Sequence, residues 1–195
     1  MPRKRPAGRR TPAAQSLILC QGTVTEPKYF QHMKEQWRSR GFTVEKEHLN
    51  PLKLVEHAKR LARREHYERV FIVVDEDDLG HELLDAAQRC HKASGKQCSF
   101  HLIVSHVCFE SWLLAHRRTI PDAARDRPHL TTLVQSEGLV ERDNPKYLSA
   151  AFPYEGWVQA KENIRVLGGN EVGEHPATAV PVVLEALRAA KGRRP

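Results

Sequence analysis

The sequence contains no apolar run that approaches the ~20 residues of a membrane-spanning helix, and its first residues form no apolar signal core. We therefore expect a cytoplasmic protein with no membrane partner. The four cysteines form no C-x-x-C pair, and three of them lie in or beside apolar segments. This spacing argues against a zinc site and against a disulfide framework, so we expect buried thiols. The cysteines are Cys20, Cys90, Cys98 and Cys108.

Glycine-rich phosphate loops and internal repeats are also missing from the sequence. The absence of such a loop counts against phosphoryl transfer on a nucleotide, although helix N-termini and clustered acids would suit that chemistry. A hydrophobic content of 40% excludes a chain that is disordered throughout.

Positive charge is concentrated at the two ends of the chain. The 195 residues carry a net charge of +7 and have a pI near 9.4, which is compatible with a polyanionic partner. A Pro/Ala/Gly-rich leader over residues 1–15 holds five cations, and three more follow residue 190. Tails of this kind are usually solvated and disordered, and only some of them bind nucleic acid. The eight cations are Arg3, Lys4, Arg5, Arg9, Arg10, Lys191, Arg193 and Arg194.

Residues 69–78 combine an apolar run with a cluster of acids. Five apolar residues in a row, 70–74, are too few for a buried helix and predict a strand covered on both faces. Ligands of open α/β sheets bind beyond the carboxyl ends of the strands, which is where the acids begin. If the extended geometry persists, Asp75 and Asp77 point to the same side, where a divalent cation would relieve their repulsion. The alternative is an acidic turn or the start of the next helix.

Strand and helix patterns alternate up to residue 118, which predicts a mostly parallel sheet with right-handed crossovers and helices on both faces. Beyond that residue no strand pattern is found. We therefore expect an α/β domain over residues 16–118 and a helical subdomain over residues 119–195 packed on it. The expected strands are 17–20, 42–47, 70–74 and 100–104, and the expected C-terminal helices are 130–134, 145–151, 157–167 and 177–191.

The first expected strand leads into a helix whose start carries a carboxylate. Gly22 supplies a tight turn, and Thr25 is the favoured N-cap because it places Pro27 inside the first turn. Thr23 and Glu26 would otherwise form a capping box, which would push the proline deeper into the helix. We therefore expect the Glu26 carboxylate to be available at the sheet edge where the other acids lie.

A further acid, Glu110, lies near the start of an apolar helix expected over residues 106–116. A single Glu in an apolar first turn is more often a partner of the helix dipole than a ligand. Its position after a predicted strand nevertheless places it at the same sheet edge.

Three motifs follow one another along the chain: Cys-Gln-Gly-Thr-Val-Thr-Glu-Pro-Lys-Tyr-Phe at residues 20–30, Asp-Glu-Asp at residues 75–77, and Ser-His-Val-Cys-Phe-Glu-Ser-Trp-Leu-Leu-Ala-His at residues 105–116. In this combination and spacing the chain resembles the RloB-like family of bacterial phage-defence proteins. The resemblance runs from about Leu17 to the C-terminus and includes residues 146–147, 160–163 and 176–178.

The resemblance implies a Toprim-like fold, in which a carboxylate after the first strand and an Asp-x-Asp after a later strand hold magnesium for phosphodiester chemistry. It assigns Glu26, Asp75 and Asp77 as ligands of Mg²⁺ or Mn²⁺ and Glu110 as a fourth acid near them. Several acids are needed because two cations about 4 Å apart stabilise both the attacking and the leaving oxygen. The resemblance also implies abortive infection as the biological role, and an ATPase as partner.

One residue departs from the family pattern. The family usually has Glu where this chain has Gln21, just before Gly22. A neutral amide can accept a weak metal contact but cannot act as a general base. Either Glu26 carries that role or catalysis is impaired.

Two hypotheses of function follow. The first is a metal-dependent nuclease acting on DNA or RNA, with Glu26, Gln21, Asp75, Asp77 and Glu110 in its site and substrate phosphates contacted by Lys28 and Lys146. The second is a catalytically inactive Toprim-like subunit that binds nucleic acid or an ATPase partner as a sensor, which the glutamine favours. The sequence leaves the oligomeric state open.

Overall fold

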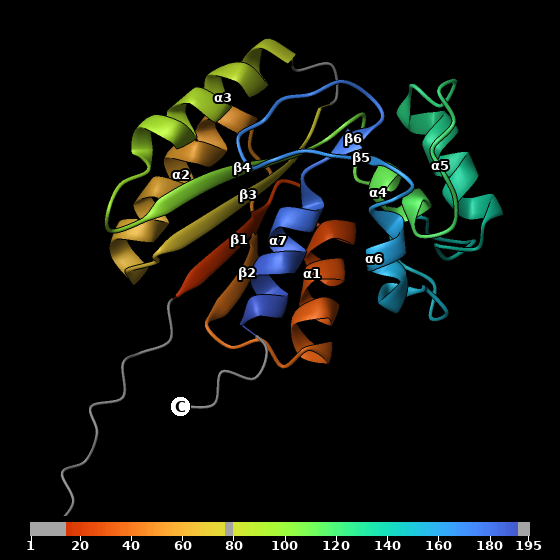
Figure 1. Cartoon of the computed structure of the whole chain (residues 1–195), viewed down its shortest axis with the longest axis horizontal. Helices are drawn as coiled ribbons and strands as arrows, with labels where there is room; N and C mark the ends of the chain where they lie inside the picture. The colour runs from red at the N-terminus through yellow and green to blue at the C-terminus, as the bar shows by residue number, and fades with distance from the viewer. Residues whose placement is uncertain (1–14, 77–79, 191–195) are drawn as a thin grey trace, which may run out of the picture.

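The computed structural model of the chain describes residues 15–76 and 80–190. Its centre is a six-stranded sheet with the strand order β2-β1-β3-β4-β6-β5 (Figure 1). The four strands expected from the sequence are present, and each pairs in parallel with its neighbours among the four. They are β1 (Ser16–Cys20), β2 (Phe42–Lys46), β3 (Arg69–Asp75) and β4 (Ser99–Ser105). The predicted α/β fold with a mostly parallel sheet is confirmed, and it is consistent with a Toprim-like fold.

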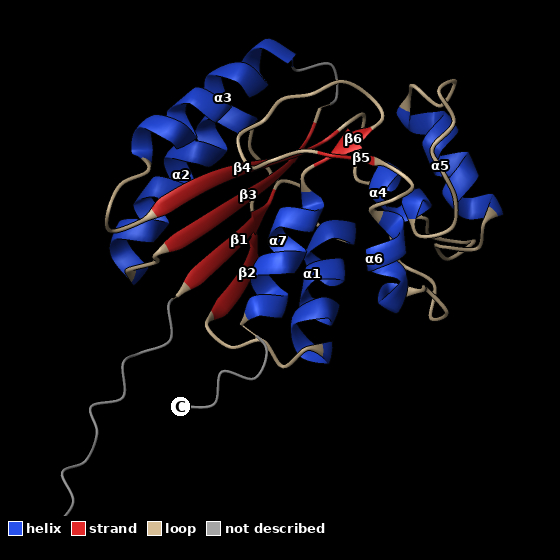
Figure 2. Ribbon diagram, in the orientation of Figure 1, coloured by secondary structure: helices blue, strands red, loops and turns tan. Residues whose placement is uncertain are grey.

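Helices cover both faces of the sheet, as expected (Figure 2). On one face lie α2 (Pro51–Glu65) and α3 (Gly80–Ala93), and on the other lie α1 (Thr25–Gln36) and α7 (Val180–Ala189). The pair Asn50-Pro51 predicts a helix start, and α2 begins there. The Asn50 side chain accepts a hydrogen bond from the Lys53 N–H at 3.0 Å and acts as the N-cap.

The alternation of side chains along the strands divides the interior into two cores. In β3, Val70, Ile72 and Val74 join the core under α2 and α3, whereas Phe71 and Val73 join the core under α1 and α7. Asp75 follows in the second series. The strand pattern therefore directs its carboxylate toward the layer of α1.

The C-terminal part contains two strands that the sequence did not predict. Ala177–Thr178 (β6) pairs antiparallel to β4, and Arg165–Val166 (β5) pairs in parallel with β6. Strands of two residues are too short to produce an alternating pattern in the sequence. The strand β4, with which β6 pairs, also lies far away along the chain, so no local signal indicates the pairing. The expectation of a purely helical C-terminal part was wrong.

The expected C-terminal helices are confirmed only in part. The short helix around 130–134 is present as α5 (Arg127–Ser136). The helix expected at 177–191 is present in a shorter form as α7, because residues 177–178 form β6. Residues 145–151 form turns, with an isolated bridge between Val140 and Leu148. Of the helix expected at 157–167, only α6 (Trp157–Ala160) is present, and a short 3-10 turn (Tyr154–Gly156) precedes it. Residues 165–166 form β5 instead.

Two further helix boundaries differ from the expectation. The apolar helix expected from residue 106 begins at Glu110 as α4 (Glu110–Ala115), because the His106 N–H is bonded to the Ala177 carbonyl and continues the sheet. Gly41 in the sequence predicts the end of the first helix, but α1 already ends at Gln36.

Cys20, Cys90 and Cys108 are buried free thiols as expected, and Cys98 is half-buried. In the part of the chain that the structure describes, no helix has the length and apolar character needed to cross a membrane. The proposed division at residue 118 stays a prediction; across it, one core is shared by Phe109, Leu130 and Leu184.

Candidate functional site

Three carboxylates gather at the carboxyl end of the sheet. Asp75 is the last residue of β3, Glu26 is the second residue of α1 just after β1, and Glu110 is the first residue of α4 shortly after β4. The strands β1, β3 and β4 are neighbours in the sheet, so the loops that follow them open onto the same edge. We refer to Glu26, Asp75 and Glu110 as the carboxylate cluster.

The electrostatics of Asp75 show how closely the cluster is assembled. Burial raises the pKa of Asp75 well above its usual range, the Glu26 carboxylate adds to this rise, and Glu110 contributes further. The acids of the cluster also affect two neighbouring thiols. Burial raises the pKa of Cys20, and Glu26 and Asp75 add to this rise. Burial also raises the pKa of Cys108, and Glu110 adds to that rise. Both thiols therefore remain neutral beside the carboxylates.

A guanidinium from the C-terminal part of the chain enters this cluster. Arg127, the first residue of α5, donates from Nη2 to Oδ2 of Asp75 at 2.8 Å, and its Nη1 lies 3.5 Å from Oε2 of Glu110. It lowers the pKa of Asp75 and so opposes the effect of burial. The Arg127 side chain is 40% exposed, so the cluster is open to solvent on the side of α5.

Sequence reasoning missed Arg127. The preceding Asp126 caps α5 by accepting from the His129 N–H, and Pro128 occupies the first turn. These local signals predict a helix start but not a contact with Asp75, which lies 52 residues earlier in the chain.

Gly22 has a different role from the one expected of it. Its φ angle lies outside the left-handed region, so the turn after β1 does not require a glycine. Instead, a Cβ at residue 22 would overlap the carboxylate of Glu26. A side chain at residue 22 would therefore displace the Glu26 carboxylate from its position beside the residues that follow β1.

Neither expected cap is present at the start of α1. The N-cap position is Val24, and no side chain bonds to the first turn. The Thr25 hydroxyl donates instead to the Lys146 carbonyl at 2.9 Å, which joins α1 to the C-terminal part of the chain. The N-cap prediction for Thr25 was therefore wrong, and the capping box of Thr23 with Glu26 is absent too.

Gln21 is held beside the carboxylate cluster by a hydrogen bond of its own. Its Nε2 donates to the Leu49 carbonyl at 2.9 Å, and this is its only side-chain hydrogen bond with a described residue. The amide therefore fixes the loop before α2. A carboxylate at this position would have no proton to donate to Leu49.

The two lysines proposed as phosphate contacts belong to neighbouring segments. Lys28 lies over the ring of Tyr147, with Nζ 3.6 Å from the ring centroid, and Lys146 is bonded through its carbonyl to Thr25. Both side chains are exposed near the start of α1. Their contact with phosphate stays a prediction.

The Asp-Glu-Asp motif is described only in its first two residues. Glu76 turns toward the buried His106, with Oε2 2.8 Å from Nδ1. Asp77 lies outside the described residues, so its convergence with Glu26 and Asp75 stays a prediction.

A group of aromatic rings packs around Tyr29, three residues after Glu26 on α1. The ring of Tyr29 on α1 packs edge-on against Phe109, Phe152 and His116, and its hydroxyl lies 3.1 Å from Nε2 of His116. Burial lowers the pKa of His116 to about 4. The imidazole is thus neutral at physiological pH, and the group of rings joins α1 to α4 without adding charge near the acids.

Oxygen donors at this edge suit a hard divalent cation. Oδ1 of Asp75 is buried and makes no hydrogen bond with any described residue, while Oδ2 accepts from Arg127. Glu26 offers a second carboxylate beside it. Among the described residues, however, no group of three or more His, Cys, Asp and Glu side chains is close enough to hold a metal ion. That Asp77 supplies a further ligand stays a prediction.

The model of one protein family, described as RloB-like protein, matches residues 16–187. The chain belongs to the RloB-like protein family. The match spans all three motifs and extends through β6 into α7. The C-terminal part of the chain therefore belongs to the family match as well. No curated protein and no solved structure matches the RloB-like chain.

Proposed function

We propose that this RloB-like protein is a divalent-metal-dependent nuclease, which hydrolyses phosphodiester bonds of DNA or RNA in a bacterial phage-defence system of the abortive-infection type. The observation that carries the proposal is the carboxylate cluster, in which three adjacent parallel strands each deliver one acid to the same sheet edge. The raised pKa of Asp75 supports it, because a perturbed carboxylate at a sheet edge is a common mark of a functional site.

In this proposal Glu26 and Asp75 hold Mg²⁺ or Mn²⁺ together with Asp77, and the Oδ1 atom of Asp75 is the coordinating oxygen. A bound cation would supply the positive charge that stabilises the scissile phosphate and the leaving oxygen. Glu110 lies at the rim of the site, where it shares Arg127 with Asp75.

The residues around the acids contribute binding and orientation. Arg127 holds one Asp75 oxygen and leaves the other available, which fixes the orientation of the carboxylate. Lys28 and Lys146 lie near the start of α1, where they would contact substrate phosphates. Gln21 positions the loop before α2 and accepts no proton in the reaction, so Glu26 is the base that remains.

The test is cleavage by the purified protein of three substrates: plasmid DNA, single-stranded DNA and tRNA. Each is incubated in EDTA, in Mg²⁺ and in Mn²⁺, and the products are resolved by electrophoresis. Cleavage that requires a divalent cation and is lost in Asp75→Asn is the expected result. If none of the substrates is cut in either metal, the nuclease proposal is wrong for these substrates.

Two observations favour a second candidate, an inactive Toprim-like subunit. Gln21 replaces the carboxylate usual in the family, and Arg127 already supplies Asp75 with a positive charge. In this case the chain would bind nucleic acid or an ATPase partner as a sensor. The candidate predicts that neither cation changes the unfolding temperature and that Gln21→Glu creates no activity.

A further inference from the structure

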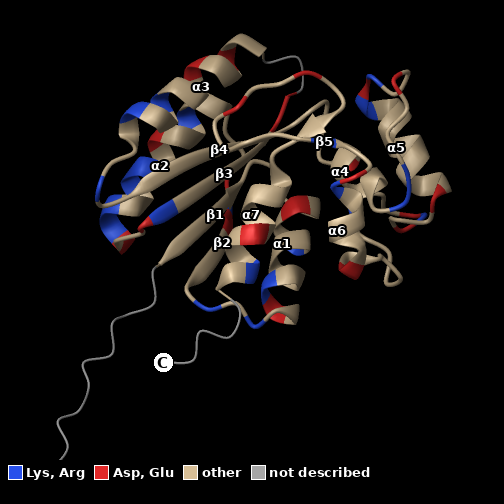
Figure 3. Cartoon of the chain, viewed as in Figure 1, with Lys and Arg blue, Asp and Glu red and all other residues tan. Residues whose placement is uncertain are grey.

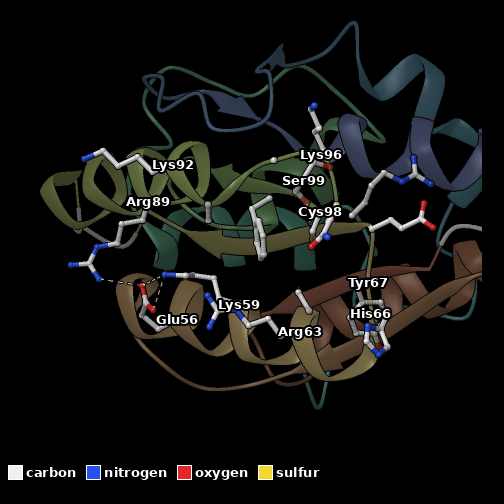
Figure 4. A pocket seen from close by; sticks show the side chains of 17 residues that line it. Glu56, Lys59, Arg63, His66, Tyr67, Arg89, Lys92, Lys96, Cys98 and Ser99 are labelled. Atoms are coloured by element: carbon white, nitrogen blue, oxygen red, sulfur yellow. Dashed lines mark hydrogen bonds and ion pairs between the residues drawn. The ribbon is translucent and has the colours of Figure 1, made fainter.

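The opposite end of the sheet carries a concave surface of different character. A cavity of about 1650 Å³ opens where β3 and β4 begin, between the later turns of α2 and α3 (Figure 4). Six Lys and Arg side chains line it, against two glutamates, Glu56 and Glu68. We call this surface the basic groove. Its cations are Lys59, Arg63, Arg69, Arg89, Lys92 and Lys96.

Only some of these cations are neutralised within the protein. Glu56 lies 3.0 Å from Nζ of Lys59 on its own helix and 3.6 Å from Nη1 of Arg89 on α3, as the dashed lines in Figure 4 mark. Three other cations make no ion pair and no side-chain hydrogen bond with residues 15–76 or 80–190. They are Arg63 on α2, Lys92 on α3 and Lys96 in the loop before β4.

A ligand for this surface must be anionic, because like charges brought together around one cavity repel until a counter-charge binds. The lining contains no exposed large apolar side chain. Among the described residues the exposed large apolar side chains are Leu84, Val158 and Val166, and none of them lines the groove. A protein partner would therefore find no apolar anchor, and a membrane surface would find nothing to insert. Strongly positive surfaces of this kind are typical of contacts with nucleic acid.

We propose that the basic groove binds the phosphate backbone of a single-stranded nucleic acid without reading its sequence. Its walls come from the neighbouring helices α2 and α3, and its floor comes from the first residues of β3 and β4. A hollow of this kind admits one flexible strand more readily than a stiff duplex. His66, exposed at the end of α2, offers a ring on which a base can stack.

The attachment of the basic leader supports this assignment. The Gln15 carbonyl accepts from the Glu68 N–H at 2.8 Å, so the chain enters β1 beside the groove. Five cations of residues 1–14 precede this point in the sequence. The segment that carries them is therefore joined to the folded part beside the groove.

The proposal is independent of cleavage at the carboxylate cluster. Binding of a fluorescein-labelled DNA strand of about 20 nucleotides is measured by fluorescence anisotropy in EDTA, between about 50 and 200 mM salt. The groove variant combines Arg63→Gln, Lys92→Gln and Lys96→Gln. We expect its Kd to rise at least about tenfold, and the slope of log K against log salt to fall by about 2, since each lost phosphate contact on a single strand removes about 0.7.

The matched control combines Lys53→Gln, Arg60→Gln and Arg142→Gln, which removes the same charge at exposed positions outside the groove. It should bind nearly as the wild type does. Equal weakening of both triple variants would show that binding follows net charge alone and would overturn the proposal. Thermal unfolding of each variant checks that the substitutions leave the fold intact.

Three further outcomes would also overturn it. The first is tighter binding of the matched duplex than of the single strand. The second is loss of binding in a leader variant, with Arg3, Lys4 and Arg5 changed to Gln, while the groove variant binds normally. The third is competition by polyglutamate as strong as that by unlabelled strand. Normal binding by Asp75→Asn in the same assay would support the proposal and separate it from the nuclease activity.

Discussion

The two ends of the central sheet differ in charge and in how that charge is balanced. At the carboxyl end, three acids lie after adjacent strands, and two of them, Asp75 and Glu110, share the guanidinium of Arg127. At the amino end, six Lys and Arg side chains surround the basic groove, and Glu56 pairs with two of them. In Figure 3 the ribbon is coloured blue, for Lys and Arg, at several positions along α2 and on the last turns of α3. One sheet therefore has the carboxylate cluster at one end and the basic groove at the other.

The net positive charge of the protein comes from the two ends of the chain. Eight of the 31 Lys and Arg residues lie in residues 1–14 and 191–195, which leaves 23 between them against 24 Asp and Glu. The folded part is thus nearly neutral, and its basic character comes from how the charges are distributed. A net charge of +7 alone would not have located either site.

The largest expected effect tests whether the carboxyl end alone performs the chemistry. Asp75→Asn removes the anionic oxygen proposed to hold the cation, so nuclease activity should fall by at least about 100-fold. Binding of single-stranded DNA in EDTA should not change. Asp85→Asn on the exposed face of α3 removes the same charge elsewhere and should retain activity. If Asp75→Asn cleaves like the wild type, Asp75 takes no part in the reaction.

The second effect concerns the stability that a cation contributes at the carboxyl end. In EDTA, Asp75→Asn should be as stable as the wild type or more stable, because burial and Glu26 make the ionised form of Asp75 costly. At a hundredfold excess over Kd, Mg²⁺ should stabilise the wild type by about 2.7 kcal/mol and the variant much less. Thermal unfolding with EDTA and with increasing Mg²⁺ measures both.

The pH dependence of the same variant has a defined sign. The folded-state pKa of Asp75 is raised, so the protonated carboxyl favours the folded state and its ionisation disfavours it. Any advantage of Asp75→Asn in EDTA should therefore be present at neutral pH and shrink as pH falls toward the usual Asp range. An advantage that grows on acidification would contradict the raised pKa.

The third effect tests Arg127 as the internal counter-charge. Removing one partner of a buried ion pair costs about 3 to 5 kcal/mol, but Arg127 is 40% exposed and solvent screens the pair. We expect Arg127→Gln to lose about 1 kcal/mol in EDTA. Mg²⁺ should then stabilise this variant more than the wild type, because the guanidinium on one Asp75 oxygen repels a cation bound to the other. Equal stabilisation of both proteins would rule out this repulsion.

The smallest effect concerns Gln21→Glu, which restores the acid usual in the family. It removes the donor to the Leu49 carbonyl and should cost about 1 kcal/mol or less in EDTA. Mg²⁺ affinity and any nuclease activity should rise if the new carboxylate reaches the cation. Isothermal titration calorimetry measures the affinity, and Gln21→Met serves as control because it removes the amide without adding charge. No difference in affinity between the two variants would place residue 21 outside the site.

Features that depend on local patterns could be predicted from the sequence. The strand ending at Asp75 follows from a continuous apolar run, and the cap at Asn50 follows from its place before Pro51. The placement of Glu26 and Glu110 at the same edge follows from parallel strands, which all end on one side of the sheet. These inferences need only the order of elements, not their contacts.

Features that depend on distant contacts could not be predicted. Arg127 pairs with Asp75 across 52 positions, and Thr25 leaves its capping role for the carbonyl of Lys146, 121 positions later. The basic groove was hidden for a related reason. The sequence of α2 contains several Lys and Arg residues, but only packing beside α3 turns their face of the helix into the wall of a cavity.

The positions of the two chain ends limit how the protein can be joined to others. Gln15 is bonded to Glu68 at the start of β3, and the last turn of α7 is bonded through the Leu187 carbonyl to Ser39, just before β2. Both ends therefore leave the folded part at the amino end of the sheet. A fusion partner or affinity tag at either terminus would be joined at this end of the sheet, and the carboxylate cluster lies at the opposite end. For the same reason, a surface attached through either end would hold the protein with its acidic edge facing the solution.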